Sequence, residues 1–241
     1  MSRNIIVLDL ETAYSADDCR HCGRHSDSHY DEGACVAWTG QAPGATVPQF
    51  SPIGWRDFPR LGLSIGCYFD YLDHHIHWFD SSTLFPTMRM FTERQPLMVS
   101  FNGIGFDFPL MREVLVAQAR PGCEKMAGNL CADFLCLEQR SYDLLAEIWK
   151  ADSVGQYERG LNSLDAIAQA NGLGAKLSHG SQAPRDWQAG RWAAVLNYCQ
   201  ADIYLTKTLF EMAIAGQPIR RAGGRDILLP KPTGVLHGSA S

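Results

Sequence analysis

The chain has 241 residues, of which 46% are hydrophobic and 20% are charged. This length suits one domain with a full core, and the composition is that of an ordinary globular protein. The net charge of −5 and the pI of about 5.9 argue against a protein that coats duplex DNA by charge alone, since such proteins are usually basic. An enzyme that acts on one end of a nucleic-acid chain is still compatible with this net charge, because bound divalent metals can supply local positive charge.

No apolar stretch in the sequence reaches the roughly 18–20 residues that a membrane helix needs. The apolar run Ile5–Leu8 near the N-terminus is too short for a signal peptide. The sequence therefore predicts a cytoplasmic protein.

The hydrophobic pattern predicts alternating strands and helices. Residues Asn4–Leu10 form a nearly continuous apolar run, which is typical of a strand buried on both faces. Further strands are predicted at Leu61–Phe69, Ile76–Phe79, Leu97–Phe101 and Arg140–Tyr142. Helices are predicted at Leu84–Glu93, Phe108–Ala119, Asp143–Lys150, Leu164–Ala170 and Arg191–Ala215. This order indicates an α/β domain whose mixed sheet is flanked by helices.

Two residues are predicted helix caps, and two segments of the chain have a less regular pattern. Asp107 is placed to cap the helix that follows it, and Ser163 is placed to cap the helix 164–170. Residues 120–141 have no clear assignment, whereas residues 218–229 predict a terminal hairpin.

One segment, residues 13–57, interrupts the order after the first strand. It is rich in Gly, Pro, Ser, His and Cys and shows no periodicity. A structureless loop of this length is unusual inside a compact domain. We therefore expect a single domain over residues 1–241 that contains 13–57 as an insertion with its own means of staying folded.

Cysteine and histidine side chains gather in this insertion. Their spacing suits a tetrahedral zinc site, with the ligand set Cys19, Cys22, His29 and Cys35. His25 is the competitor for the position of His29. A structural Zn²⁺ would order a segment that has almost no apolar core. The alternative is a polar loop with free thiols.

Acidic side chains stand at the ends of two predicted strands. Asp9 and Glu11 are two residues apart, so both point to one face of the first strand. Two neighbouring acids raise each other's pKa unless a cation lies between them. Asp107 follows the strand 97–101, at the sheet edge where α/β proteins bind ligands. The alternatives are an ordinary acidic turn for the first pair and a plain helix cap for Asp107.

Tyr198 and Asp202 lie four residues apart on the longest predicted helix, so they share one face. Taken alone, they could equally be a packed tyrosine and a solvated aspartate. Their order along the chain is more informative. Asp-x-Glu on a first strand is followed by Asn-x3-Phe-Asp at a strand-to-helix junction and by Tyr-x3-Asp on a late helix.

This order resembles the DEDD exonuclease superfamily in its DEDDy branch, which has a ribonuclease H-like fold. The resemblance is closest to predicted exonucleases related to the proofreading domain of B-family DNA polymerases. Four further segments are similar to that group, namely Gly54–Trp55, Leu61–Ser64, Tyr142–Leu145 and Leu161–Ala168.

The resemblance implies a 3′→5′ exonuclease that uses two Mg²⁺ or Mn²⁺ ions. Asp9 would bridge both ions, Glu11 and Asp202 would complete the site of the attacking water, and Asp107 would hold the second ion. Carboxylates, rather than His or Cys, suit such ions. Tyr198 would orient the water, since a phenol with its ordinary pKa of about 10 is a poor base.

The remaining candidates concern the substrate. Thr12, Asn102 and Phe106 lie beside the acids and are candidates for contact with the terminal nucleotide. Phe106 could stack on a base or pack in the core. Lys176 could contact a phosphate, with a solvated lysine as the alternative.

The expected substrate is nucleic acid with a free 3′ end, with single-stranded DNA favoured over RNA. Any polymerase, helicase or other replication or repair partner would be a separate chain. The competing hypotheses are an RNA-directed exonuclease, a non-catalytic nucleic-acid-binding module of the same fold, and an internally cutting nuclease.

Overall fold

The computed structural model describes residues 4–20, 51–151, 161–176 and 182–232. The main sheet consists of β1 (Ile5–Thr12), β2 (Leu63–Asp70), β3 (His75–Phe79), β4 (Leu97–Ser100) and β5 (Tyr142–Asp143). A second sheet pairs β6 (Ile219–Arg220) with β7 (Asp226–Ile227). The helices are α2 (Phe58–Leu61), α3 (Leu84–Arg94), α4 (Asp107–Ala117), α5 (Glu124–Glu138), α6 (Leu144–Ala151), α7 (Leu164–Ala170), α8 (Gln182–Gln188) and α9 (Trp192–Ala215).

The main sheet has the strand order β3-β2-β1-β4-β5. β1 is its central strand and runs antiparallel to β2 and parallel to β4. β3 is antiparallel to β2, whereas β5 is parallel to β4. The predicted class, an α/β domain with a ribonuclease H-like mixed sheet, is therefore confirmed. No helix among the described residues is both long and apolar enough to cross a membrane.

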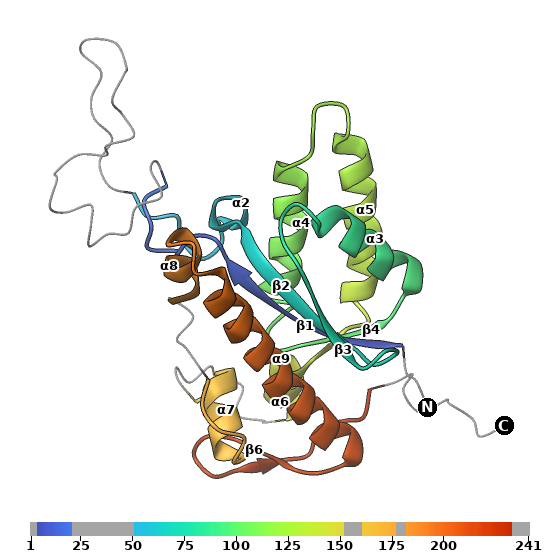
Figure 1. Ribbon diagram of the computed structural model, residues 1–241. Coiled ribbons are helices and arrows are strands. Elements are labelled where there is room, and N and C mark those ends of the chain that lie inside the picture. The colour runs from blue at the N-terminus through green and yellow to red at the C-terminus, as the bar shows by residue number, and fades with distance from the viewer. Residues whose placement is uncertain (1–3, 21–50, 152–160, 177–181, 233–241) are drawn as a thin grey trace, which may run out of the picture.

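Two hydrophobic cores cover the two faces of the sheet. Ile6, Leu8 and Leu10 of β1 belong to the core that α3, α4 and α5 share with the sheet. Ile5 and Val7 belong to the core built with α9, and Figure 1 shows these helices on opposite sides of the strands. Side chains alternate along a strand. Asp9 and Glu11, which continue the alternation of Ile5 and Val7, therefore face α9.

The structure corrects three details of the sequence prediction. β2 begins at Leu63 rather than Leu61, because residues 58–61 form α2 and Gly62 ends it at a φ of 60°. The unassigned stretch 120–141 contains α5, whose buried residues recur at helical spacing. α8 was not predicted, since it is short and contains Pro184. The cap at Ser163 is confirmed, because its hydroxyl accepts a hydrogen bond from the Ala166 backbone.

Both described ends of the segment 13–57 are tied to the domain. Cys19 forms a β-bridge with Pro52. The Ile53 amide donates to the Asp18 carbonyl at 2.9 Å, and Ala16 and Ile53 are buried in the core. Residues 21–50 lie outside the described part of the chain. The two described ends thus meet each other, and Trp55 of the second end lines the same pocket as Asp9 and Glu11.

A substitution at Gly66 on β2 tests the packing around the central strand. An added Cβ would lie 2.3 Å from the ring of Phe79 and 2.7 Å from the side chain of Leu10. We expect Gly66→Ala to lower the free energy of unfolding by about 1–3 kcal/mol, measured by urea denaturation. Gly128, in the middle of α5, has no neighbour within 4 Å of an added Cβ among the described residues, and Gly128→Ala should leave stability unchanged or raise it by up to ~1 kcal/mol. A Gly66→Ala protein as stable as the wild type would contradict this packing.

Candidate active site

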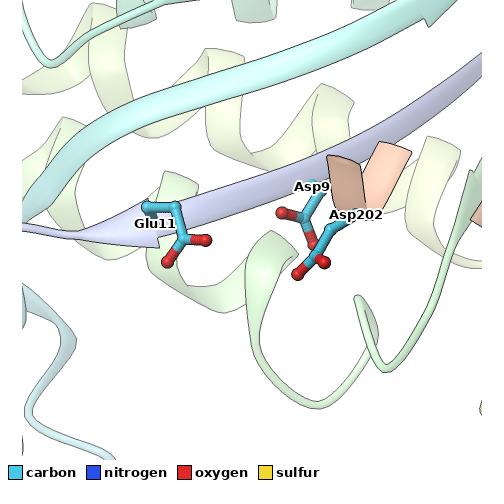
Figure 2. A group of neighbouring side chains, drawn as sticks. All are labelled: Asp9, Glu11 and Asp202. Carbon is cyan, nitrogen blue, oxygen red and sulfur yellow. The ribbon is translucent and has the colours of Figure 1, made fainter. Parts of the chain in front are cut away.

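Three acidic side chains from two elements converge beside the central strand. Asp9 and Glu11 project from β1, and Asp202 projects from α9 toward Asp9 (Figure 2). One carboxylate oxygen from each of the three lies within 4.8 Å of the others. The backbone that carries them is fixed, because the Cys199 thiol of α9 donates to the Asp9 carbonyl at 3.3 Å and the Ser64 hydroxyl donates to the Glu11 carbonyl at 2.9 Å.

The fourth predicted acid, Asp107, lines the same pocket from a different direction. It is buried at the start of α4, but it is not among the three acids whose oxygens lie within 4.8 Å of one another. The expectation that it caps this helix is wrong. Phe106 occupies the cap position, and Asp107 is the first residue of the helix itself. Its carboxylate lines the pocket and accepts hydrogen bonds from the backbone amides of Leu10 and of Asp107 itself.

A tight loop, residues 101–106, carries Asn102 and Phe106 into the pocket. Asn102 adopts a φ of 71°, and its backbone amide donates to the buried carboxylate of Asp143 at 3.0 Å. The Ile104 amide donates to the other oxygen of Asp143, also at 3.0 Å. A Cβ on Gly105 would lie 2.6 Å from the Asn102 side chain, so a larger residue there would displace that side chain. Asp143 was not predicted, although it lies in the segment Tyr142–Leu145 that resembles the family.

Lys176 is part of the acid cluster. Its ammonium group donates to an oxygen of Asp202, and its backbone amide donates to Asp165 of α7 at 2.8 Å. The alternative of a solvated lysine is therefore wrong. Burial by itself would lower the pKa of Lys176, but the carboxylates of Asp202 and Asp9 outweigh burial and raise it. A permanent cation thus lies among the acids.

The acids have strongly perturbed protonation equilibria. Burial, followed by the charge of Asp202, raises the pKa of Glu11 to about 8. Burial and the charge of Asp143 raise the pKa of Asp107 to about 7. Burial, Asp202 and the other two acids raise the pKa of Asp9 well above its ordinary value. Lys176 opposes these shifts but does not cancel them, so the site still holds an excess of negative charge when the acids ionise.

Tyr198 reaches the pocket from α9, one turn before Asp202. Its hydroxyl donates to the carboxylate of Asp186 on α8 at 2.9 Å. Asp186 is buried and was not predicted, because α8 itself was not predicted. Burial disfavours its charge, but hydrogen bonds from Arg191, Gln182 and Tyr198 outweigh burial and lower the pKa of Asp186.

The acids, Lys176 and Tyr198 line one pocket of about 190 Å³. The lining includes every residue predicted as catalytic or substrate-binding, namely Asp9, Glu11, Thr12, Asn102, Phe106, Asp107, Lys176, Tyr198 and Asp202. Phe106 also packs edge-on against Phe58 at 5.7 Å between ring centroids, so it meets both the pocket and the core.

Trp55 lines the same pocket and had no predicted role. Its side chain is 65% exposed, which is unusual for a tryptophan. It follows Gly54, whose φ of 83° is readily adopted only by glycine. The Gly54 amide donates to the Ala16 carbonyl at 2.8 Å. The Gly54–Trp55 pair of the sequence was the available signal, and the structure places Trp55 in the lining of the pocket that holds the acids.

The donor set suits a hard divalent cation. Asp9 Oδ2 is buried and has no hydrogen-bond partner among the residues that the structure describes. A buried, unpaired carboxylate oxygen is costly unless a cation or proton satisfies it. Carboxylate oxygens close together are the ligands that Mg²⁺ and Mn²⁺ prefer. Asp9, Glu11 and Asp202 therefore fit the metal ions that the sequence predicts.

The predicted zinc site has a different outcome. Cys22, His25, His29 and Cys35 lie outside the described residues. Cys19 is described and buried. The zinc site stays a prediction from the sequence.

Comparison with known proteins agrees with this geometry. Residues 80–215, more than half of the chain, match a family described as a predicted 3′-5′ exonuclease related to the exonuclease domain of PolB. The chain belongs to this family. The matched range contains Asp107, Lys176, Tyr198 and Asp202, whereas Asp9 and Glu11 lie before it. The structure brings both sets of residues to one pocket.

A solved structure of the family B DNA polymerase from the hyperthermophilic archaeon Pyrobaculum calidifontis is similar to this chain with a TM-score of 0.44 and 14% identity. The similarity covers 86% of this chain and 24% of the polymerase, so the chain spans about a quarter of that protein's length. No curated protein matches the chain.

The raised pKa values of the acids predict how stability depends on pH without metal. Unfolded carboxyls titrate near pH 4, whereas Glu11 in the folded chain titrates at about 8. Between these values the folded chain binds more protons, so its stability falls as pH rises through this window. We expect Glu11→Gln to raise the free energy of unfolding at pH 9 in EDTA by roughly 1–3 kcal/mol, and by much less near pH 4.

Thermal unfolding at both pH values measures this effect. Glu113 is an exposed glutamate outside the pocket, so Glu113→Gln serves as the matched control and should change stability little at either pH. A loss of stability in Glu11→Gln at pH 9 would contradict the electrostatic description of the site.

Proposed function

We propose that this protein is a metal-dependent 3′→5′ exonuclease that hydrolyses phosphodiester bonds at the 3′ end of single-stranded DNA. Residues 1–241 would form one exonuclease domain, with 13–57 as an insertion in it. The observation that carries the proposal is the convergence of Asp9, Glu11 and Asp202 in one pocket with Asp107. Membership of a family of predicted exonucleases supports it.

The proposed mechanism assigns each acid a role. Two bound divalent ions would activate a water molecule and stabilise the charge on the leaving oxygen. Asp9 is central in the acid group and is proposed to hold both ions, with Glu11 and Asp202 completing the site next to the water. Asp107, which lies farther from this group, is proposed to hold the second ion. Lys176 is proposed to contact a substrate phosphate, since its cation already lies in the pocket.

Tyr198 is proposed to orient the attacking water. It lines the pocket one turn from Asp202. Its hydroxyl proton is directed to Asp186, so the hydroxyl oxygen has lone pairs that can accept a hydrogen bond from water. This arrangement orients a water molecule without removing its proton, as expected of a phenol with a high pKa.

Aromatic side chains support a single-stranded substrate. Trp55, Phe101 and Phe106 line the pocket together with the polar groups. Exposed aromatic rings stack on unpaired bases of any sequence, whereas the bases of a duplex are already stacked on each other. Thr12 and Asn102 are proposed to contact the sugar and phosphate of the terminal nucleotide. A polymerase, a helicase or another replication or repair protein is the proposed partner.

The acid cluster itself favours catalysis over a passive binding module of the same fold. Burying several carboxylates together costs stability, and a module that only held nucleic acid would gain nothing from them. RNA remains the alternative substrate class, and parallel assays on DNA and RNA distinguish the two.

Digestion of end-labelled oligonucleotides tests the proposed activity. Single-stranded DNA carrying a 5′ label should give a ladder that shortens from the 3′ end with Mg²⁺ or Mn²⁺ and not with EDTA, and the same assay on 5′-labelled RNA tests the alternative substrate. We expect Asp9→Asn to lower the rate by at least about 10³-fold, because it weakens the ligand proposed for both ions. Absence of cleavage of every substrate with either metal would refute the proposal, and internal cuts would favour the endonuclease alternative.

Trp55 provides a separate test of the substrate class. Loss of one stacked base costs ~1–3 kcal/mol by alanine substitution, so Trp55→Ala should raise KM for single-stranded DNA about tenfold. Hydrolysis of bis(p-nitrophenyl) phosphate, which has no base, should not change. Trp192 is 62% exposed but lies outside the pocket, and Trp192→Ala is the matched control. Equal KM values for the Trp55→Ala and wild-type proteins would contradict base stacking at Trp55.

A further inference from the structure

Asp186 is a buried carboxylate whose two oxygens have different partners. Oδ1 accepts hydrogen bonds from the Gln182 amide at 2.8 Å and from the Arg191 guanidinium at 2.8 and 2.5 Å. Oδ2 accepts the hydrogen bond from the Tyr198 hydroxyl at 2.9 Å. The first oxygen is thus occupied by amide and guanidinium donors, while the second receives the tyrosine.

These contacts hold the carboxylate in one orientation. Asp186 is 3% exposed, and its backbone carbonyl also accepts a hydrogen bond from the Arg191 amide at 2.7 Å. Arg191 is the residue directly before α9, the helix that carries Tyr198. Asp186 therefore connects α8 both to the beginning of α9 and to a side chain two turns further along it.

The chemistry of the partners requires a group that only accepts hydrogen bonds. Arg191 and Gln182 present N–H donors, and an ionised carboxylate has no proton of its own to donate. The Tyr198 hydroxyl must then act as the donor in its contact with Asp186. A hydroxyl has a single proton, so its remaining capacity on the pocket side is that of an acceptor.

We propose that Asp186 is a positioning residue that fixes the Tyr198 hydroxyl as a hydrogen-bond acceptor toward the attacking water. This inference rests on the proposed exonuclease function. Asp186 does not line the pocket among the described residues, so it acts through Tyr198 and not on the substrate. An acceptor oxygen at Tyr198 directs a water proton away from the scissile phosphate and leaves a water lone pair free for attack.

Asparagine at this position would reverse the arrangement. Asp186→Asn keeps the size of the side chain but places an NH₂ group among donors. The asparagine can satisfy Arg191 and Gln182 through its carbonyl oxygen only by turning its NH₂ group toward Tyr198. The Tyr198 hydroxyl would then accept a hydrogen bond from this NH₂ group and turn its own proton toward the pocket. In that orientation it would no longer accept a hydrogen bond from the attacking water.

A double-mutant cycle on single-stranded DNA with Mg²⁺ tests this role. We expect Asp186→Asn to lower kcat about tenfold with KM changed by less than about twofold, because only the orientation of the water is affected. Tyr198→Phe should lower kcat by at least as much. In the Tyr198→Phe background, Asp186→Asn should have no further effect on kcat, since its action requires the hydroxyl.

Gln188 offers a matched control on the same helix. Its amide donates to the Ala13 carbonyl and to the Asp18 carboxylate, both at 3.1 Å. Gln188→Ala removes contacts that dock α8 onto the domain and leaves the Asp186–Tyr198 pair in place. We expect it to lower Tm and to leave kcat near the wild-type value. A loss of kcat equal to that of Asp186→Asn would show that α8 docking, and not the carboxylate, matters.

A second measurement does not depend on turnover. With 3-fluorotyrosine incorporated at position 198, the ¹⁹F chemical shift should move in Asp186→Asn and stay unchanged in Gln188→Ala. Asp186→Glu, which keeps the charge beside Arg191, provides a folded variant if the asparagine variant is unstable, and should also move the shift. An unchanged ¹⁹F shift in the Asp186 variants, or additive losses of kcat in the cycle, would overturn the proposal. Absence of activity in the wild type together with a moved shift would instead refute the exonuclease function.

Discussion

The site depends on one constraint, which is the burial of several carboxylates in a small volume beside the central strand. Asp9 and Glu11 are there because β1 places alternate residues toward α9, and Asp202 is there because α9 packs across that face. Burial by itself already raises the pKa of Asp9 and of Glu11. Together they raise one another's pKa and leave an oxygen of Asp9 unpaired among the described residues. Only added positive charge, from a cation or a proton, offsets this accumulation of negative charge.

Lys176 supplies part of that charge in the protein itself. Its ammonium group contacts Asp202, and its pKa rises in spite of burial. One monovalent cation is not enough for four carboxylates, so the site keeps a capacity for further cations. The same lysine would face a phosphate once divalent ions neutralise the acids, since a positive side chain in a pocket attracts an anionic ligand. Charge balance would thus link the proposed metal site to the proposed substrate contact.

Two kinds of contact surround the acids. Some fix the backbone that carries them, and others orient neighbouring residues of the pocket. Hydrogen bonds to the carbonyls of Asp9 and Glu11 fix the strand. Asp143 performs the corresponding task for the loop 101–106, where it accepts two backbone amides. Asp186 acts on a side chain, because it receives the Tyr198 hydroxyl. These two buried aspartates are not in the acid cluster, yet each determines how a residue of the pocket is oriented.

The sequence by itself determined the class of fold and predicted the polar residues that line the pocket. The unbroken apolar run of the first strand, the period of two that pairs Asp9 with Glu11, and the period of four that pairs Tyr198 with Asp202 are local patterns, and they remain visible without the structure. The short helix α8 contains a proline and has little apolar periodicity, so no local pattern predicted it. Asp186 was missed with it.

Only the tertiary structure decided which charges meet. Lys176 and Asp202 are separated by 26 residues along the chain, and the sequence pattern was equally compatible with a solvated lysine. Asp107 was expected to cap its helix, but it is the first residue of α4 and its side chain lines the pocket. Trp55 entered the site because the segment after β1 returns to the core. Local patterns specify faces and periods, whereas contacts between distant segments depend on how the hydrophobic cores close around the sheet.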